Sequence, residues 1–385
     1  MDLDAFNELL TPRGQRALTE AGELAGADPV AAATKLRKTY DAALTSAALT
    51  QAGLRDRARA KFGEDAGRMY FTPHGLEQST RKEVAEHRAR RLAGATVVDA
   101  CCGIGGDFLA LARAGCTVTA VDVDPLTVAV ARANAEALGL AGRVTVTVGD
   151  AAAVRPEEYD VLFADPARRT SRGRTFDPLA YSPPWPVVLD LVSRAGRACV
   201  KVAPGIPYEF IPAGAEAEWV SYKGEVKEAT LWTGDHPTRR ATLLPGGHGL
   251  TATGAQAHVG AMGRYVYEPD GAAIRAHLVG EVAELVGGRL LDPLVAYITA
   301  DEPVDTPWAA RYEVDDLMTF SLKKLRAALR ERQIGNVTIK KRASAVDIER
   351  LRADLRLNGK KSAVIILTRI MNKPYALICD TTPPA

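Results

Sequence analysis

Four short apolar runs between residues 96 and 166 each end at an aspartate, and this repeat constrains the fold more than any other feature. The runs end at Asp99, Asp122, Asp150 and Asp165, and helix-like stretches such as 125–139 lie between the first three. Apolar strands that alternate with helices pair in parallel through right-handed crossovers. Because parallel strands end at one edge of their sheet, the sequence predicts an α/β core whose acids gather at that edge.

The first acid leads directly into a glycine-rich turn, residues 99–106. Its glycines allow a sharp turn and a close approach of the backbone to a ligand; they are Gly103, Gly105 and Gly106. An acid at the tip of the next strand, here Asp122, can accept hydrogen bonds from a ribose diol. Phe108 occupies the position where a dinucleotide fingerprint needs its third glycine, so NAD and FAD are disfavoured. The turn therefore predicts a nucleoside-type pocket.

The pattern D-x-x-x-G-x-G-G in this turn resembles motif I of class I S-adenosylmethionine-dependent methyltransferases, which have a Rossmann-like core. The resemblance implies that the turn passes under the methionine part of S-adenosylmethionine, that the second acid holds the ribose, and that the third lies beside the adenine. The cofactor residues implied in this chain are Asp99, Cys101, Gly103, Gly105, Gly106, Asp122, Asp150 and Ala151. Many members of the family have glycine where this chain has Cys101. We interpret Cys101 and Cys102 as packing residues, because an apolar setting raises the pKa of a thiol.

The stretch DACCGIGGD is also similar to the DxxCGxGG stretch of trimethylguanosine synthase and its relatives. That family carries an upstream Phe-Thr-Pro segment, comparable to Phe71, Thr72 and Pro73 here. The resemblance implies that Phe71 and Thr72 belong to a loop that folds over the cofactor and excludes water. The alternative is that Tyr70 and Phe71 dock a helical N-terminal domain on the core.

The fourth apolar run ends in the sequence LFADPARRT, at the position of methyl transfer in such a fold. Amino-group methyltransferases carry [DNS]-P-P-[YFW] here, and the acid and the next carbonyl align the target amine with the methyl group. Asp165 and Pro166 match and are the predicted catalytic residues. Ala167 and Arg168 replace the second proline and the aromatic residue, which leaves an exocyclic amine as the acceptor in doubt.

Two further sequence features bear on the acceptor. The segment YSPPW (181–185) offers Tyr181 or Trp185 as a base-stacking face, or it begins a helix. Cys199 lies within an apolar run, and we do not favour it as the covalent nucleophile of a pyrimidine C5 methyltransferase.

Arginines follow the predicted catalytic position closely. Four of them are Arg168, Arg169, Arg172 and Arg174. A cluster at this place could bind phosphates at a substrate entrance, although it could also be a solvated loop. We predict that Arg168, Arg169 and Arg172 bind substrate.

The C-terminal part of the chain is strongly basic. Residues 321–361 contain thirteen Lys or Arg against four Asp or Glu, whereas the whole chain has a net charge of only +2. Such a segment favours an anionic partner, most often nucleic acid, but an Arg-rich solvent face of a helix is the alternative. The pattern GNVTIKKR…SAVIILTRI resembles the THUMP-like domain of some bacterial class I methyltransferases, which implies RNA as the partner. Lys340, Lys341 and Arg342 are predicted to contact its phosphates.

Changes in pattern divide the chain into four predicted parts. These are a helical domain (1–93), the Rossmann-like methyltransferase core (94–245), a linker and helical connection (246–314) and an α+β THUMP-like domain (315–385). Residues 314–334 are expected to be helical. The runs at 218–232 and 241–245 are expected to close the core sheet as an antiparallel pair.

Composition excludes several classes of protein. The first residues are acidic and lack the apolar core of a secretory signal, and no run reaches the roughly twenty apolar residues of a membrane span. The five cysteines and six histidines show no disulfide-framework or metal-ligand spacing. We expect a cytoplasmic protein without a membrane or metal partner, and its oligomeric state is left open.

These observations together predict an S-adenosylmethionine-dependent methyltransferase that modifies a nucleotide of RNA. Two alternatives remain from the sequence. One is a methyltransferase for a small molecule or a protein. The other is a non-catalytic RNA-binding protein with a degenerate methyltransferase fold, which the altered D-P-A-R sequence would permit.

Overall fold

The computed structural model describes residues 1–167, 169–170, 173–174, 177–234 and 236–380. It divides into two compact units. The first consists of Met1–Glu216 and Glu228–Pro237, and the second of Ala217–Lys227 and Thr238–Ala385. Within the described residues, no helix has both the length and the apolar character needed to cross a bilayer.

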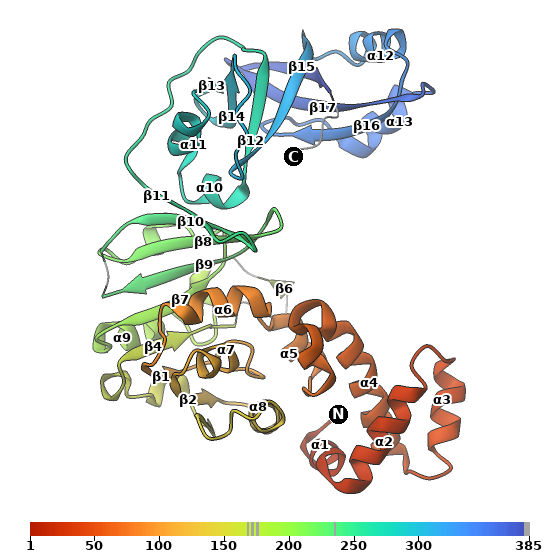
Figure 1. Ribbon diagram of the computed structural model, residues 1–385, viewed down its shortest axis with the longest axis vertical. Helices are drawn as coiled ribbons and strands as arrows, with labels where there is room; N and C mark the ends of the chain where they lie inside the picture. The colour runs from red at the N-terminus through yellow and green to blue at the C-terminus, as the bar shows by residue number, and fades with distance from the viewer. Residues whose placement is uncertain (168, 171–172, 175–176, 235, 381–385) are drawn as a thin grey trace. The chain divides into compact units, whose positions relative to one another are not determined.

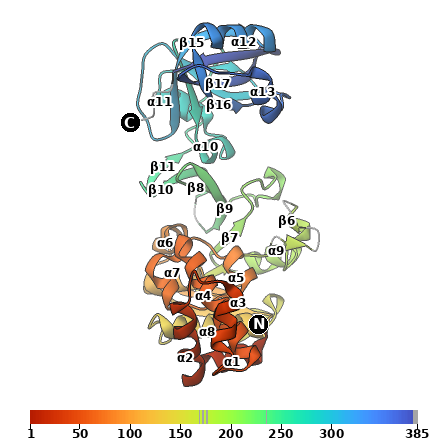
Figure 2. The same cartoon turned by 90° about the vertical axis from the view of Figure 1, so that its right-hand side faces the viewer.

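The first unit begins with a series of helices, coloured red to orange in Figures 1 and 2. They are α1 (Leu3–Leu10), α2 (Pro12–Glu23), α3 (Pro29–Leu36), α4 (Ala42–Phe62), α5 (Pro73–Gln78) and α6 (Lys82–Arg90). Aspartate or threonine side chains cap the first five at their N-termini. Phe6 and Leu44 from these helices belong to the same hydrophobic core as Val97 and Val118 from the following strands. The helices therefore complete the core of the first unit.

The sheet of the first unit has the strand order β9-β7-β4-β1-β2-β3. Its strands are β1 (Thr96–Asp99), β2 (Thr117–Asp122), β3 (Val144–Val148), β4 (Val161–Ala164), β7 (Ala198–Val202) and β9 (Glu225–Thr233, in this unit from Glu228). All neighbours run parallel except β7 and β9. The helices between strands are α7 (Phe108–Arg113), α8 (Pro125–Ala137) and α9 (Trp185–Arg194). β1 lies between β2 and β4, so the order in which successive strands are added to the sheet reverses beside β1. Open α/β sheets bind ligands at such a point.

The second unit contains a small group of strands that differs from the expectation. β8 (Glu216–Tyr222) pairs in parallel with β10 (Arg239–Leu244), and β10 pairs antiparallel with β11 (His248–Thr251). The expected antiparallel pairing of the runs at 218–232 and 241–245 is therefore wrong. The antiparallel partner of β10 is instead the strand that follows it after a short turn.

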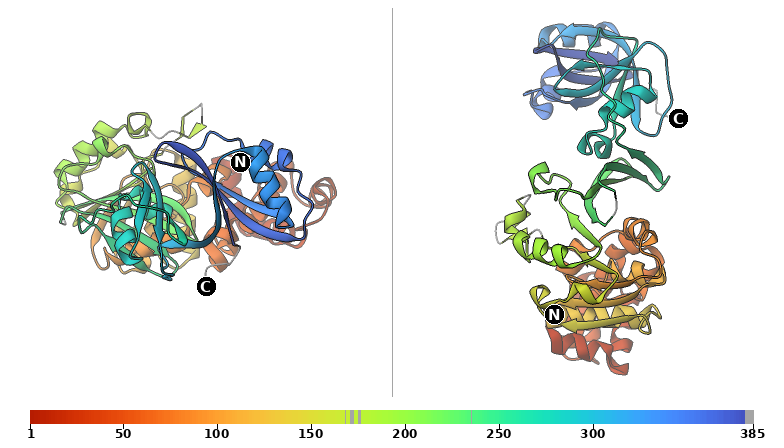
Figure 3. Two further views of the ribbon diagram at one scale, coloured as in Figure 1. Left: turned by 90° about the horizontal axis from the view of Figure 1, so that it is seen from above. Right: turned by 90° about the vertical axis from the view of Figure 1, so that its left-hand side faces the viewer.

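A seven-stranded sheet forms the rest of the second unit, in teal and blue in Figure 3. Its order is β13-β14-β12-β15-β18-β17-β16. The strands are β12 (Tyr265–Pro269), β13 (Arg289–Asp292), β14 (Val295–Ala300), β15 (Ala309–Thr319), β16 (Ile334–Lys341), β17 (Lys361–Ile370) and β18 (Lys373–Cys379). Leu325 of α12 (Leu322–Glu331) and Leu351 of α13 (Ile348–Leu355) pack in one core with Ile365 of β17. Two shorter helices, α10 (Gly271–Arg275) and α11 (Val279–Leu285), precede β13.

Two expectations for this region need correction. Residues 246–314 are not simply a linker and helical connection, because β12, β13 and β14 belong to the same sheet as β15–β18. Residues 314–334 are not helical throughout, since β15 continues to Thr319. The physical reason is that β15 has a hydrogen-bonded neighbour on each side, β12 and β18. Pairing with strands that are distant in the sequence determines the conformation of β15, so this conformation could not be predicted from the local spacing of apolar residues.

Candidate active site

A cavity of about 650 Å³ lies in the first unit, at the carboxyl ends of β1, β2 and β4. It brings together most residues that the sequence analysis selected for cofactor binding and catalysis. Those that line it are Thr72, Cys101, Gly103, Gly106, Asp122, Asp150, Ala151, Asp165 and Pro166. The predicted gathering of acids at this edge of the sheet is therefore observed.

The glycine-rich turn is held by the acid of the next strand. Gly103 (φ +52°) and Gly105 (φ +101°) adopt the left-handed conformation that favours glycine. The Gly103 N–H donates to Asp122 Oδ2 at 3.0 Å, and the Asp124 N–H donates to Asp122 Oδ1 at 3.0 Å. A Cβ on Gly105 would lie 2.6 Å from the ring of Phe108. Phe108 thus packs under the turn, where a dinucleotide fingerprint would have its third glycine.

Asp99 is a buried acid that lacks part of its hydrogen bonding. It ends β1 and is 1% exposed. One carboxylate oxygen accepts the Cys101 N–H at 3.2 Å, but Oδ2 has no partner in the part of the chain that the structure describes. Burial, and then the nearby Asp107 carboxylate, raise the pKa of Asp99 well above its ordinary value. A bound cationic group would satisfy this oxygen and favour its ionised form.

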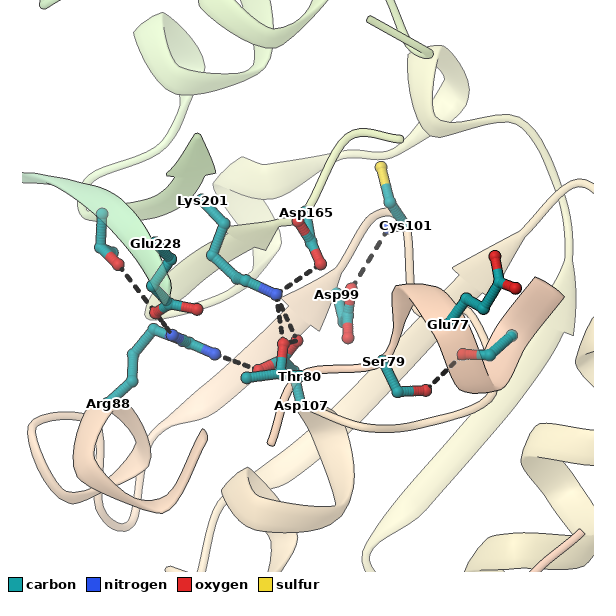
Figure 4. A network of polar contacts seen from close by, with 12 residues as sticks. Glu77, Ser79, Thr80, Arg88, Asp99, Cys101, Asp107, Asp165, Lys201 and Glu228 are labelled. Atoms are coloured by element: carbon teal, nitrogen blue, oxygen red, sulfur yellow. Dashed lines mark hydrogen bonds and ion pairs between the residues drawn. The ribbon is translucent and has the colours of Figure 1, made fainter. Parts of the chain in front are cut away.

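Asp165 is held by a lysine that the sequence analysis missed. Lys201, near the end of β7, is 3% exposed, and its Nζ lies 2.5 Å from Asp165 Oδ2. The same ammonium donates to Asp107 Oδ2 at 3.0 Å and to Thr80 Oγ1 (Figure 4). The sequence carried one signal, a single lysine inside the apolar run ACVKVA.

A second buried cation fixes Asp107 from the opposite side. Arg88 of α6, also 3% exposed, pairs with Asp107 Oδ1 and with Glu228 Oε1 of β9. Burial opposes ionisation of Asp107, but Arg88 and Lys201 outweigh it and lower its pKa to about 2. The end of the glycine turn is therefore tied by charge to a helix and to two strands.

Comparison with known proteins identifies the family. Family models match at three places: "Methyltransferase domain" at residues 97–169, "THUMP domain-like" at 309–381, and a domain of unknown function at 2–58. An uncharacterised S-adenosylmethionine-dependent methyltransferase of Mycobacterium tuberculosis is 36% identical over 332 residues, 82% of this chain and 90% of the relative. The chain belongs to the S-adenosylmethionine-dependent methyltransferases. The predicted cofactor and the THUMP-like resemblance are thereby confirmed.

Two other similarities are more limited. An uncharacterised RNA methyltransferase of Parasynechococcus marenigrum is 36% identical over 96 residues, 24% of this chain and 20% of that protein. A crystal structure of a candidate methyltransferase from Porphyromonas gingivalis W83 has a TM-score of 0.77 and 20% identity. It covers 95% of this methyltransferase and 98% of its own chain, and shows a shared fold.

The described lining of the methyltransferase cavity is acidic. Its acids are Glu77, Asp107, Asp122, Asp124, Asp150 and Asp165, and no lysine or arginine occurs among the lining residues in the ranges given above. Such a lining attracts cations and disfavours anions. A sulfonium centre suits this cavity, whereas these residues provide no counter-ion for a phosphate.

The sequence left two roles open for the loop before α5, covering the cofactor or docking the helices on the core, and Thr72 and Phe71 differ in which role they have. Thr72 lines the cavity and caps α5, because its Oγ1 accepts the Gly75 N–H at 2.9 Å. Phe71 does not line it: its ring is fully buried, with its centroid 5.6 Å from that of Phe62, and Gln51 bonds to its N–H and C=O. Phe71 therefore packs the helices on the core, and its expected place at the cofactor is not observed.

The structure distinguishes between the two roles considered for the segment 181–185, a base-stacking face and the start of a helix. Tyr181 and Trp185 are 3% and 4% exposed, and the Tyr181 hydroxyl accepts the Ala203 N–H at 3.2 Å. Neither ring is available for stacking, and Trp185 begins α9, as the helix-start alternative stated. Ala167 pairs with Ser182, which brings Ser182, Pro183 and Pro184 to the cavity wall beside Asp165.

The predicted arginine cluster lies largely outside the described residues. This holds for Arg168 and Arg172, and for the side chain of Arg169, whose backbone belongs to β5 (Arg169–Thr170).

The basic residues predicted to contact phosphates in the second unit are partly paired with an acid. Lys340 Nζ lies 2.5 Å from Glu268 Oε2, and Arg342 lies 3.5 Å from Glu268 Oε1. Their charge is thus partly neutralised, while Lys341 is exposed.

The cysteines support the packing interpretation. Burial, followed by nearby carboxylates, raises the pKa of Cys101 and of Cys102 well above the ordinary value. Cys199 is fully buried in β7, and burial also raises the pKa of its thiol. All three thiols are poor nucleophiles at neutral pH, because only the thiolate attacks.

Proposed function

We propose that this methyltransferase transfers a methyl group from S-adenosylmethionine to a nucleotide of RNA, with Asp165 and Pro166 orienting the acceptor. The observation that carries the proposal is the position of Asp165. It follows β4, lines the same cavity as the glycine turn, and is held by a buried ammonium. An acceptor bound there would share one cavity with the methyl donor. Alignment of the two reactants supplies most of the rate of such a transfer.

The proposed cofactor site uses the predicted residues that the cavity brings together. Those that line it are Cys101, Gly103, Gly106, Asp122, Asp150 and Ala151, with Thr72 from the neighbouring loop. Asp99 and Gly105 do not line the cavity but belong to the same glycine-rich turn, and we keep them as proposed cofactor residues. When bound, S-adenosylmethionine supplies an electrophilic methyl group on a sulfonium. Asp99 Oδ2 fits the cationic part of this cofactor, because it is a buried carboxylate oxygen to which no described residue donates a hydrogen bond. Asp122, at the tip of β2, fits the ribose hydroxyls.

The acceptor is proposed to be a nucleobase. The acidic lining provides no described counter-ion for a phosphate at the methyl-transfer position, whereas Asp165 can accept a hydrogen bond from an N–H group. The RNA backbone would then remain outside this cavity. Arg168, Arg169 and Arg172 are kept as a proposed phosphate contact at its entrance.

The second unit is proposed to bind RNA. Support comes from the THUMP-like match, from the partial RNA methyltransferase relative, and from the basic segment 321–361. Within that segment Lys323, Lys324 and Lys341 are exposed. They are better placed for phosphates than Lys340 and Arg342, which share Glu268.

We also propose a cytoplasmic location, supported by five free cysteines.

Transfer of a labelled methyl group tests the proposal directly. The full chain is incubated with S-adenosylmethionine labelled in the methyl group and with total RNA from a strain that lacks the gene. We expect the label to appear in RNA from that strain and to be released by ribonuclease digestion. RNA from the parent strain should take up much less label. Label confined to protein or to small molecules would overturn the RNA assignment. No label in any fraction, despite cofactor binding by calorimetry, would support the non-catalytic alternative.

Reversing the charge of Lys323 and Lys324 should weaken RNA binding in a salt-dependent way. Each lost phosphate contact reduces the slope of log affinity against log salt concentration by about 1. Binding of a fluorescent RNA oligonucleotide to Lys323→Glu/Lys324→Glu measures this. The matched control, Lys35→Glu/Lys38→Glu, makes the same change of net charge at exposed positions in and beside α3. Equal weakening in both variants would show a general charge effect and contradict a site on the second unit.

Cofactor binding should release a proton from Asp99. Burial raises the pKa of this carboxyl, so its protonated form stabilises the folded protein, and that contribution is lost as pH rises through the raised pKa. A cationic ligand favours the ionised form, so cofactor affinity should increase with pH over the same interval. Calorimetry in two buffers of different ionisation enthalpy should give different apparent binding enthalpies. The difference should vanish in Asp99→Asn; if it persists there, another group releases the proton.

A further inference from the structure

We propose that Lys201 is a positioning residue for methyl transfer, and that it fixes the Asp165 side chain at the acceptor end of the cavity. The inference rests on the proposed function of Asp165. Lys201 acts without direct contact with the substrate. The orientation of Asp165, and hence the rate of transfer, depends on this buried ammonium.

The contacts of Lys201 use its full hydrogen-bonding capacity. An ammonium group has three N–H donors and no acceptor. Here the acceptors are Thr80 Oγ1, Asp107 Oδ2 at 3.0 Å and Asp165 Oδ2 at 2.5 Å. They come from three separate segments: the loop before α6, the end of the glycine turn, and the residue after β4 (Figure 4). Lys201 is therefore the point where the methyl-donor and acceptor sides of the cavity are joined.

Two of these three partners are themselves held in place. Asp107 Oδ2 accepts the Thr80 hydroxyl at 2.9 Å, and Asp107 Oδ1 pairs with Arg88. Arg88 in turn pairs with Glu228, which also accepts the Thr230 hydroxyl at 3.2 Å. The ammonium is thus anchored on a buried network of charged and hydroxyl groups. Asp165 is its more exposed acid partner, with a side chain 22% exposed against 9% for Asp107.

Lys201 acts in this arrangement as a fixed cation. Burial works against its charge, but Asp107 and then Asp165 outweigh this effect and raise its pKa above the ordinary value. A lysine that remains protonated cannot take a proton from the acceptor. With one carboxylate oxygen bound to this cation, the plane of the Asp165 carboxylate and the direction of its second oxygen are restricted. Such restriction matters because misplacement by about 1 Å can slow a reaction about 100-fold.

The test compares two variants of Lys201 in the full chain. In single turnovers with saturating cofactor and RNA from the deletion strain, Lys201→Met should transfer methyl about 100-fold more slowly. Cofactor affinity should remain within several-fold. Lys201→Arg keeps the charge but cannot direct three donors from one nitrogen, so we expect a loss of at least about 10-fold. The matched control is Lys227→Met, a strand lysine 2.5 Å from Glu225 and outside the cavity lining.

A double-mutant cycle separates positioning from general stability. If Lys201 acts through Asp165, then Lys201→Met should not slow transfer further in the Asp165→Ala background. Wild-type transfer by Lys201→Arg, or multiplied losses in the double mutant, would overturn the inference. If Lys201→Met does not fold, Lys201→Arg alone decides between these outcomes.

A structural readout keeps the inference testable if RNA is not the acceptor. In that case wild-type protein transfers no methyl to RNA, and the proposed function fails first. A crystal structure of Lys201→Arg with S-adenosylhomocysteine then shows whether the Asp165 carboxylate has turned away from its wild-type position. An unchanged carboxylate would overturn the role of Lys201, and a reoriented one would support it.

Discussion

Asp165→Ala is expected to slow methyl transfer by at least about 100-fold while cofactor affinity stays within several-fold. The reason is the place of Asp165 in the cavity, after β4 and on the side where Ala167 pairs with Ser182. Removal of its carboxylate takes away the group proposed to align the acceptor. It leaves the glycine turn and its bond to Asp122 intact. Single-turnover transfer and calorimetry with S-adenosylmethionine measure the two quantities separately.

The matched control lies at the other end of the same strand. Asp160 immediately precedes β4, is exposed, and accepts hydrogen bonds from the N–H and hydroxyl of Thr96. Asp160→Ala should leave transfer within a few-fold of wild type. If Asp165→Ala also transfers at the wild-type rate, Asp165 does not orient the acceptor. A parallel loss of cofactor affinity would instead assign Asp165 to cofactor binding.

Arg88→Met should have the largest effect on stability, lowering the free energy of unfolding by about 3–5 kcal/mol. Arg88 is almost completely buried and is paired with two carboxylates, Asp107 and Glu228. Its removal leaves both acids buried with less compensation, and the cost of an uncompensated buried charge exceeds that of a broken surface pair. Urea unfolding followed by circular dichroism measures the loss.

Arg90→Met provides the comparison within the same helix. Arg90 ends α6 and is exposed, so its replacement should change the free energy of unfolding by no more than about 0.5 kcal/mol. Similar values for the two variants would show that the buried network around Arg88 contributes little to stability.

The cofactor side of the site could be predicted because its residues are close in sequence. Asp99 and the three glycines lie in one turn, and Asp122 ends the next strand. Their proximity in the fold can therefore be predicted from the local sequence pattern. Lys201 and Arg88 could not be placed in the same way. Their partners Asp165 and Glu228 are 36 and 140 residues distant, and only the folded sheet brings them together.

The errors in the fold have the same origin. The run 315–319 has helix-compatible spacing, but β15 is fixed by its pairing with β12 and β18. The parallel pairing of β8 with β10 depends on the partner strand in the same way. Phe71 resembled a cofactor residue because of its neighbours Thr72 and Pro73. Phe71 is instead buried against Phe62, and this contact between separate segments could not be predicted from the Phe-Thr-Pro motif.

The seven-stranded sheet determines where the C-terminal unit can be separated from the rest of the chain. The THUMP-like match begins at residue 309, the first residue of β15, whereas β15 pairs along Ala309–Glu313 with β12, which lies before it. A segment starting there would carry an uncovered strand edge with free N–H and C=O groups, which recruits other chains into aggregates. A C-terminal unit produced on its own should therefore begin before Tyr265 and include β12–β14.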